Sequence, residues 1–156
     1  MRLIAMAVLT LVLGGPGVAC GLPPDLTAQR AELLAEVNAV RAQQGVAPLR
    51  ADAKLDRAAQ EHACDSARHG RMSHTGSDGS HFAQRIALAG YRIGRDGAAE
   101  NLGFGYRVAR AVVQGWMASP GHRRNILAPR LSELGVGLAL ERSGRPHWVI
   151  VAASPR

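Results

Sequence analysis

The sequence predicts an α+β layered sandwich, and three observations lead to that prediction. Segments with apolar residues at helical spacing occupy most of the chain between residues 27 and 117. Two β-rich runs, 134–140 and 147–152, follow near the C-terminus, and Ser143-Gly144 lies between them, which is typical of an antiparallel hairpin. Helices grouped before a terminal hairpin favour helices layered on an antiparallel sheet over repeated βαβ units. We expect about four helices and three or four strands.

The first helix is predicted over residues 27–44, with Thr27 as its N-cap and Gly45 as its stop. Its apolar positions recur three and four residues apart, at Leu33, Leu34, Val37 and Val40. Asn38 and Arg41 lie at the edge of this apolar face, where polar groups need partners. We expect them to join a structural hydrogen-bond network and not to take part in chemistry.

The second helix is predicted to begin after its N-cap, Asp52, and to end at Gly70. Its inner face consists mostly of small residues, so a neighbouring element can approach it closely; the face comprises Leu55, Ala58, Ala59, His62, Ala63 and Ser66. His62 is therefore interpreted as a core histidine with a hydrogen-bond partner in preference to a ligand.

A loop rich in turn-forming residues follows this helix and carries the first candidate site residue. The loop is predicted over residues 72–80 and contains His74. Asp78 or Ser80 can cap a third helix that runs to Gly90. A loop histidine alone indicates little, because histidines are common on surface loops.

Two further candidates lie in the segments around the fourth helix. Residues 99–105 have glycine at alternate positions, which predicts a short strand or extended segment pressed against another backbone, with Glu100 projecting from it. The fourth helix is predicted over residues 106–117, and Ser119-Pro120-Gly121 is expected to stop it. His122 is then expected on a turn at the rim of the fold, where solvent and ligands reach it.

The N-terminus has the organisation of a secretory signal peptide, predicted over residues 1–19. A positive start precedes an apolar run from Leu3 to Leu13, which is too short to span a bilayer, and small residues form a cleavage site. Two alternatives exist for Cys20. Ala19-Cys20-Gly21 resembles a bacterial lipoprotein box, which would carry a lipid anchor, whereas Cys20 and Cys64 can form a disulfide in an oxidising compartment.

After an N-terminal segment, residues 20–26, the chain predicts one domain over residues 27–156. The formal net charge is +7 and comes almost entirely from arginine, since Lys54 is the one lysine. Strong basicity can indicate an anionic partner such as nucleic acid, an acidic glycan or a phospholipid surface. Because the arginines are spread along the chain and aromatic residues are scarce, we favour a compositional origin in a GC-rich genome and expect no nucleic-acid partner.

Several short motifs, taken in order, resemble those of one superfamily. They are Asn38-x-x-Arg41, Pro48-Leu49 with Leu55, Met72-Ser73-His74-Thr75, Glu100-Asn101-Leu102, Gly115-Trp116, Ser119-Pro120-Gly121-His122-Arg123-Arg124-Asn125-Ile126, Gly135-Val136-Gly137 and Trp148-Val149. Together they resemble the CAP domain of the cysteine-rich secretory protein, antigen 5 and pathogenesis-related 1 superfamily, in its bacterial SCP-like branch. The resemblance covers residues 26–153 and implies a three-layer α-β-α sandwich around a small antiparallel sheet.

The resemblance also implies a cleft with two histidines and two acidic residues. By motif, His74 and His122 match the two histidines and Glu100 matches the first acid. Ser119 stands where the second acid is expected. This departure from the animal and plant pattern weakens any mechanism that needs two carboxylates.

The same residues raise the question of a metal. Two imidazoles and one carboxylate, His74, His122 and Glu100, supply the ligand number of an open zinc site. The metalloprotease spacing of two histidines one helical turn apart is absent from the sequence. Since some relatives bind divalent metal at this cleft, the resemblance permits Zn²⁺ or another divalent ion here.

Three functions are consistent with these residues. The favoured one is an exported, non-catalytic module, a monomer in the periplasm, cell envelope or extracellular space, that binds a lipid, glycan or protein at the cleft. The second is a metal-assisted or His/Glu-assisted hydrolase with His74 or His122 as general base and Glu100 as its orienting group. Its weakness is the nucleophile, because neither Ser73 nor Ser119 lies in a nucleophile elbow. The third is a purely structural His/Glu cluster.

Overall fold

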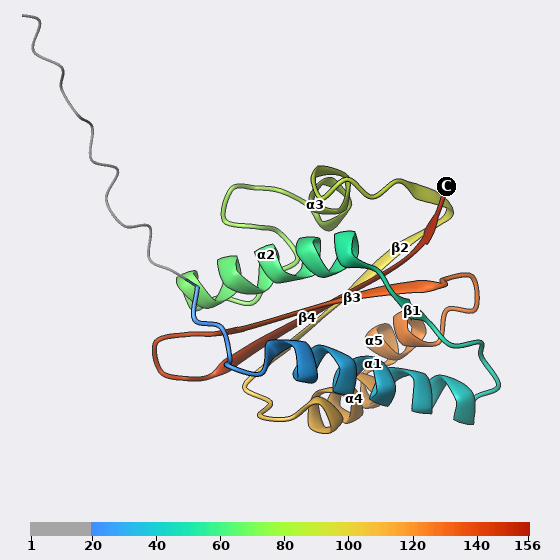
Figure 1. The fold of residues 1–156 in the computed structure, drawn as a ribbon, viewed down its shortest axis with the longest axis horizontal. Coiled ribbons are helices and arrows are strands. Elements are labelled where there is room, and N and C mark those ends of the chain that lie inside the picture. The colour runs from blue at the N-terminus through green and yellow to red at the C-terminus, as the bar shows by residue number, and fades with distance from the viewer. Residues whose placement is uncertain (1–19) are drawn as a thin grey trace, which may run out of the picture.

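The computed structural model describes residues 20–156, so the predicted signal peptide lies outside the described residues. Figure 1 shows three layers, in which a central sheet separates α2 and α3 from α1, α4 and α5. Five helices and four strands make up this described part of the chain, one helix more than expected. The predicted α+β sandwich is confirmed. Across residues 20–156, no helix is both long and apolar enough to cross a bilayer.

The sheet has the strand order β1-β3-β4-β2. The hairpin of β3 (Glu133–Leu140) and β4 (Pro146–Pro155) is antiparallel, as predicted, and Gly144 in its turn has a φ of 79°. β2 (Ile93–Phe104) pairs antiparallel with β4, whereas the two-residue β1 (Arg50–Ala51) pairs parallel with β3. The short strand or extended segment predicted over residues 99–105 is thus the second half of a longer strand, β2.

One face of the sheet is covered by α1 (Leu26–Gln43), α4 (Ala109–Ala118) and α5 (Pro120–Ile126). The core on this side is built from aliphatic side chains and the two tryptophans, among them Leu33, Val37, Val112, Trp116, Leu138, Trp148 and Ile150. Each buried indole N–H has a partner: Trp116 donates to the Leu102 carbonyl and Trp148 to the Tyr106 carbonyl, both at 2.7 Å. These bonds fasten β2 and its following loop to the core.

The other face is covered by α2 (Ala53–His69) and α3 (Phe82–Leu88). α2 lies so close to β3 that a Cβ at Gly135 would meet the Leu55 carbonyl carbon at 2.0 Å, and one at Gly137 would meet the Ala59 carbonyl oxygen at 2.2 Å. The predicted close approach to the small-residue face of α2 is confirmed. The caps of α2 are also as predicted, with Asp52 accepting two amide hydrogen bonds and Gly70 left-handed.

Three predicted local boundaries were wrong. Asp25, not Thr27, occupies the N-cap position of α1. His81 is the N-cap of α3, and Asp78 instead accepts from the Ser80 amide within the preceding turn. Pro120 does not lead into a turn: it begins α5, where its missing N–H costs no helical hydrogen bond, so His122 lies on a helix.

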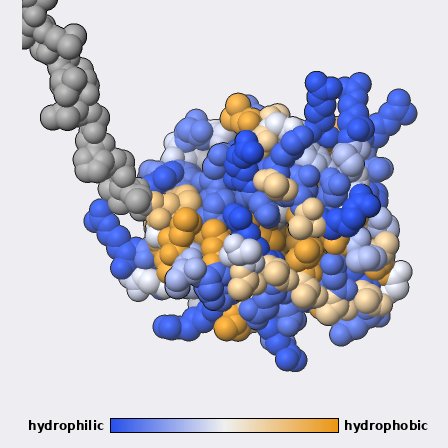
Figure 2. All heavy atoms as spheres, viewed as in Figure 1, coloured by the Kyte–Doolittle hydropathy of each residue, from blue (hydrophilic) through white to orange (hydrophobic). Residues whose placement is uncertain are grey.

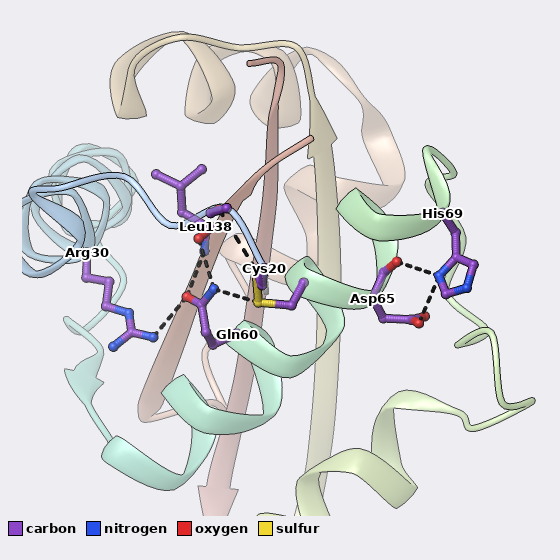
Figure 3. Close-up of a disulfide and its surroundings, with 8 residues drawn as sticks. Cys20, Arg30, Gln60, Asp65, His69 and Leu138 are labelled. Atoms are coloured by element: carbon purple, nitrogen blue, oxygen red, sulfur yellow. Dashed lines mark hydrogen bonds and ion pairs between the residues drawn. A yellow bond between two sulfur atoms is a disulfide. The ribbon is translucent and has the colours of Figure 1, made fainter. Parts of the chain in front are cut away.

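The predicted disulfide between Cys20 and Cys64 is present (Figure 3). It ties the N-terminal segment to α2, and the Leu140 amide also donates to the Gly21 carbonyl at 2.7 Å. A sulfur atom in this bond cannot also carry a thioether-linked lipid, so the disulfide and the lipid anchor are mutually exclusive states of Cys20.

Candidate functional site

The four residues predicted to form the cleft line one hollow of about 600 Å³. His74 reaches it from the loop between α2 and α3, Glu100 from β2, and Ser119 and His122 from the start of α5. The sheet brings these segments together, since β2 lies between α3 and α5. We call this hollow the cleft.

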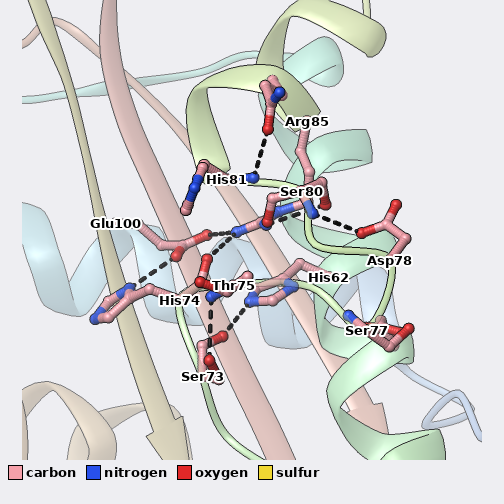
Figure 4. Close-up of polar contacts among 12 residues, drawn as sticks. His62, Ser73, His74, Thr75, Ser77, Asp78, Ser80, His81, Arg85 and Glu100 are labelled. Carbon is pink, nitrogen blue, oxygen red and sulfur yellow. Dashed lines mark hydrogen bonds and ion pairs between the residues drawn. The ribbon is translucent and has the colours of Figure 1, made fainter.

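Glu100 is the buried acid at the base of the cleft, with its side chain 1% exposed. Its Oε1 lies 2.8 Å from His74 Nδ1 and its Oε2 lies 2.7 Å from Arg85 Nη2 (Figure 4). Because a carboxylate oxygen accepts, His74 carries its proton on Nδ1 and directs Nε2 away from the acid. The His74 side chain is 58% exposed, so only the Glu100 end of this pair is buried.

Arg85 is the residue of this cluster that sequence reasoning missed. It lies on α3, is buried, and also donates to the carbonyl oxygens of Ser80 at 2.7 Å and His74 at 3.1 Å. It therefore ties together the acid, the histidine loop and α3. A buried carboxylate needs a charged partner. The sequence could have indicated Arg85 as that partner, because this arginine directly precedes the core residue Ile86.

The opposite side of the cleft is held by two asparagines. Asn101 is completely buried, donates to the His122 carbonyl at 3.1 Å and accepts from Asn125 Nδ2 at 2.9 Å. The same Asn125 amide lies 3.2 Å from the Glu100 carbonyl. These bonds connect the middle and the end of α5 to β2 and thereby fix where His122 stands.

Arg41 fastens the far end of α5. Its guanidinium is completely buried and donates to the carbonyl oxygens of Ile126 at 2.6 Å, Ala128 at 3.1 Å and Leu131 at 3.2 Å. On the same helix, Asn38 exchanges two hydrogen bonds with the Leu49 backbone. The structural network expected for these two residues is confirmed.

His122 is half-buried, and within residues 20–156 its ring makes no hydrogen bond. Burial lowers its pKa, and the nearby charge of His74 lowers it further. The lowered pKa favours the neutral ring at pH 7, and His122 lines the cleft.

His62 is a core histidine, as interpreted from the sequence. It is buried, and its Nε2 lies 2.8 Å from the Ser73 carbonyl oxygen, directly before His74. Its Nδ1 has no partner in the described part of the chain. Burial lowers the pKa of His62, so the ring is neutral and supports the loop that carries His74.

The predicted metal ligands do not fit a cation as they stand. No group of three or more His, Cys, Asp or Glu side chains in residues 20–156 is arranged to hold a metal ion. Both Glu100 oxygens already have partners, and the Arg85 guanidinium 2.7 Å from Oε2 opposes a second positive charge there. Glu100 is thus a poor third ligand, and binding of Zn²⁺ or another divalent ion by His74, His122 and Glu100 stays a prediction.

A family model described as the cysteine-rich secretory protein family, CAP, matches residues 34–152. The chain belongs to the CAP family. Its sequence is 32% identical over 116 residues to an uncharacterized Bacillus subtilis protein, YkwD, a match that covers 74% of this chain and 44% of that protein. It is 28% identical over 112 residues to an uncharacterized Bacillus subtilis membrane protein, YlbC, covering 72% of this chain and 32% of that one. The CAP chain thus spans less than half the length of either relative.

Solved structures share the CAP fold at low sequence identity. An outer surface protein from Borrelia burgdorferi has a TM-score of 0.78 at 20% identity, over 87% of this chain and 99% of that one. An extracellular protein containing an SCP domain from Bacillus anthracis has a TM-score of 0.73 at 21% identity, over 86% of this chain and 45% of that one. The predicted family and its α-β-α sandwich are confirmed.

Proposed function

We propose that this CAP domain is an exported, non-catalytic module that binds a ligand in the cleft between His74 and His122. One observation carries the proposal: the acid at the base of the cleft has all its hydrogen-bond partners within the protein, whereas a histidine at the rim does not. Glu100 has both oxygens occupied, whereas the His122 ring makes no hydrogen bond within the described residues. Groups that already have partners stabilise the fold, and groups that lack them are available to a ligand.

The lining of the cleft favours a ligand with an acidic group. Arg124, Arg130 and His81 also line it, and all three side chains belong to exposed residues. The charge of Glu100 is offset by Arg85, 2.7 Å away. The accessible side chains are thus basic or neutral, a surface that a phosphate or carboxylate group on a lipid, glycan or protein would complement.

The hydrolase alternative has less support. Ser73 Oγ accepts from the Thr75 amide at 3.1 Å, and Ser119 lies in the cleft. Neither hydroxyl makes a hydrogen bond to an imidazole among residues 20–156, as an activated serine nucleophile requires. Glu100 bonds to His74 and not to His122, and it also pairs with Arg85. It is therefore better suited to holding the loop that carries His74 than to acting in a catalytic cycle.

Export is supported by the predicted signal peptide and by the disulfide, which is typical of oxidising compartments. Two of the similar structures belong to proteins described as an outer surface protein and an extracellular protein. A ligand in the periplasm, cell envelope or outside the cell is consistent with both.

A retention experiment tests the proposal. The purified mature protein is incubated with a cell-envelope extract, and retained molecules are identified by mass spectrometry for wild type and for the double variant His74→Ala with His122→Ala. His69→Ala, which changes a histidine outside the cleft, is the matched control. We expect wild type and His69→Ala to retain the same compound and the double variant to lose it. Equal retention by all three proteins would reject the cleft as the binding site.

A further inference from the structure

We propose that the end of the molecule formed by the β2–α4 loop and the β3–β4 turn docks onto an anionic phospholipid surface. The docking face consists of Phe104, Tyr106, Arg107, Val108, Arg110 and Arg145. The proposal is independent of the cleft and of any lipid anchor on Cys20. It rests on exposed apolar side chains, on the arginines around them, and on two residues that are unfavourable for the stability of α4.

The apolar part of the docking face is concentrated in five consecutive residues. The large apolar side chains exposed in the described region are Leu22, Leu88, Phe104, Tyr106 and Val108. Three of these five fall between residues 104 and 108, with exposed fractions of 39% for Phe104, 36% for Tyr106 and 50% for Val108. Single exposed apolar residues are ordinary, but a cluster of this kind indicates an interaction surface.

Arginines surround this cluster. Arg107 and Arg110 are exposed in the same segment, and residues 104–110 contain no acidic residue. From the β3–β4 turn, the Arg145 guanidinium lies 4.7 Å from the centre of the Phe104 ring. Its acidic partner, Glu141, has a side chain only 9% exposed, so the accessible charge at this end is positive.

Two positions at the start of α4 oppose the stability of that helix. Val108 occupies the N-cap, where Ser, Thr, Asp or Asn would accept an amide hydrogen bond, and it provides no side-chain cap. Arg110 lies in the first turn, where the helix dipole disfavours a positive charge. A sequence that violates two local rules within three residues indicates a requirement other than folding.

The combination of charge and apolar surface favours a bilayer over an acidic glycan. Arginines alone would suit either partner, but only a bilayer offers an apolar interior to aromatic and aliphatic side chains. In Figure 2, the lower edge of the molecule, where Figure 1 places the loop that leads into α4, shows hydrophobic atoms beside strongly hydrophilic ones. Arginine next to exposed aromatic and aliphatic groups is the composition expected at a membrane interface.

The docking face and the cleft are separate sites. Phe104 lies four residues further along β2 than Glu100, about 13 Å at the usual rise of an extended strand. The two sites therefore have no residue in common. A domain docked through its β2–α4 loop can still present the cleft to a ligand.

Vesicle sedimentation of the purified mature protein tests the proposal. The vesicles are phosphatidylcholine alone or phosphatidylcholine mixed with phosphatidylglycerol. We expect binding to the mixed vesicles only, weakened about fivefold by each of Arg107→Gln and Arg110→Gln. The matched control, Arg95→Gln, removes an exposed arginine outside the docking face and should bind as wild type does.

Val108→Ser provides the decisive variant, because serine is a better N-cap than valine and cannot weaken binding by unfolding α4. We expect it to keep or raise the Tm and to lower vesicle binding at least about threefold. Leu88→Ser, which removes an exposed apolar side chain elsewhere, should leave binding unchanged. Equal binding by both serine variants, or equal binding to the two kinds of vesicle, would overturn the proposal. Loss of binding with the arginine variants but not with Val108→Ser would indicate a purely acidic partner and would overturn it as well.

Discussion

The two sides of the cleft hold their histidines in different ways. On the α3 side, His74 is held by its ring, which donates to the buried Glu100 carboxylate at 2.8 Å. On the α5 side, His122 is held by its backbone, whose carbonyl accepts from Asn101 at 3.1 Å while the ring makes no hydrogen bond within residues 20–156. The His74 ring is thus hydrogen-bonded within the fold through Nδ1, whereas the His122 ring is held in place only through its backbone.

This difference separates stability from binding. The α3 side depends on buried charges that neutralise one another, so removing either charge leaves the other without compensation. The α5 side depends on neutral amides, which place the backbone and leave the side chain free to meet a ligand. We therefore expect substitutions on the α3 side to affect mainly folding and those at His122 to affect mainly binding.

The largest effect is expected from Arg85→Met. This change leaves the Glu100 carboxylate buried with only His74 as partner, and should lower the free energy of unfolding by about 3–5 kcal/mol. Urea unfolding followed by circular dichroism measures it. The double variant Arg85→Met with Glu100→Leu, which removes both charges, should lose less than the single variant. A double variant less stable than Arg85→Met would contradict the buried ion pair.

Asn101→Ala should have the next largest effect. It leaves the His122 carbonyl without its side-chain donor and removes one of the two acceptors of the Asn125 amide, at a cost of about 1–3 kcal/mol, and it loosens α5 from β2. Asn38→Ala removes two hydrogen bonds to the Leu49 backbone, and neither residue lines the cleft, so it is the control. Both variants should be less stable, but only Asn101→Ala should also retain less ligand. Equal retention would show that Asn101 does not position the binding site.

The pH dependence of stability tests the state of the buried histidines. Burial lowers the pKa of His62, His122 and His147, so the unfolded chain takes up protons first as the pH falls below about 6.5, the ordinary histidine value. Stability should be constant above that pH and fall below it, by up to about 1.4 kcal/mol per pH unit for each such ring. His62→Gln, which keeps a donor toward Ser73, should flatten the profile measured by urea unfolding between pH 4.5 and 7.5. An unchanged slope would mean that His62 is not buried in its neutral form.

The smallest effect on stability is expected from His122→Ala. Since its ring has no partner among the described residues, the change should stay within about 0.5 kcal/mol in thermal unfolding. His74→Ala should cost more, about 1 kcal/mol, because Glu100 loses a hydrogen-bond donor that is itself exposed to solvent. Both variants should retain less ligand. A His122→Ala protein less stable than His74→Ala would reverse the roles assigned to the two sides.

The sequence predicted several local features correctly, although it misplaced the N-caps of α1 and α3. Asp52 and Gly70 mark the ends of α2 because capping depends on the residues next to the helix end. The hairpin around Gly144 followed from a run that alternates with small residues, a β-branched run and the turn between them. Pro120 misled because the same residue that ends one helix is favoured in the first position of the next, and only the packing of α5 on β2 selects between the two.

The sequence by itself determined the layered architecture through periodicity and caps, and its resemblance to the CAP motifs pointed to four residues that line the cleft. These signals are properties of neighbours along the chain. Tertiary structure alone decided what each cleft residue does. Arg85 is the counter-ion of Glu100, 15 residues away along the chain, and Asn101 donates a hydrogen bond to the His122 carbonyl, 21 residues away. Such pairings arise because a buried charge or amide must find its partner in space, and distance along the chain does not say which groups the fold will bring together.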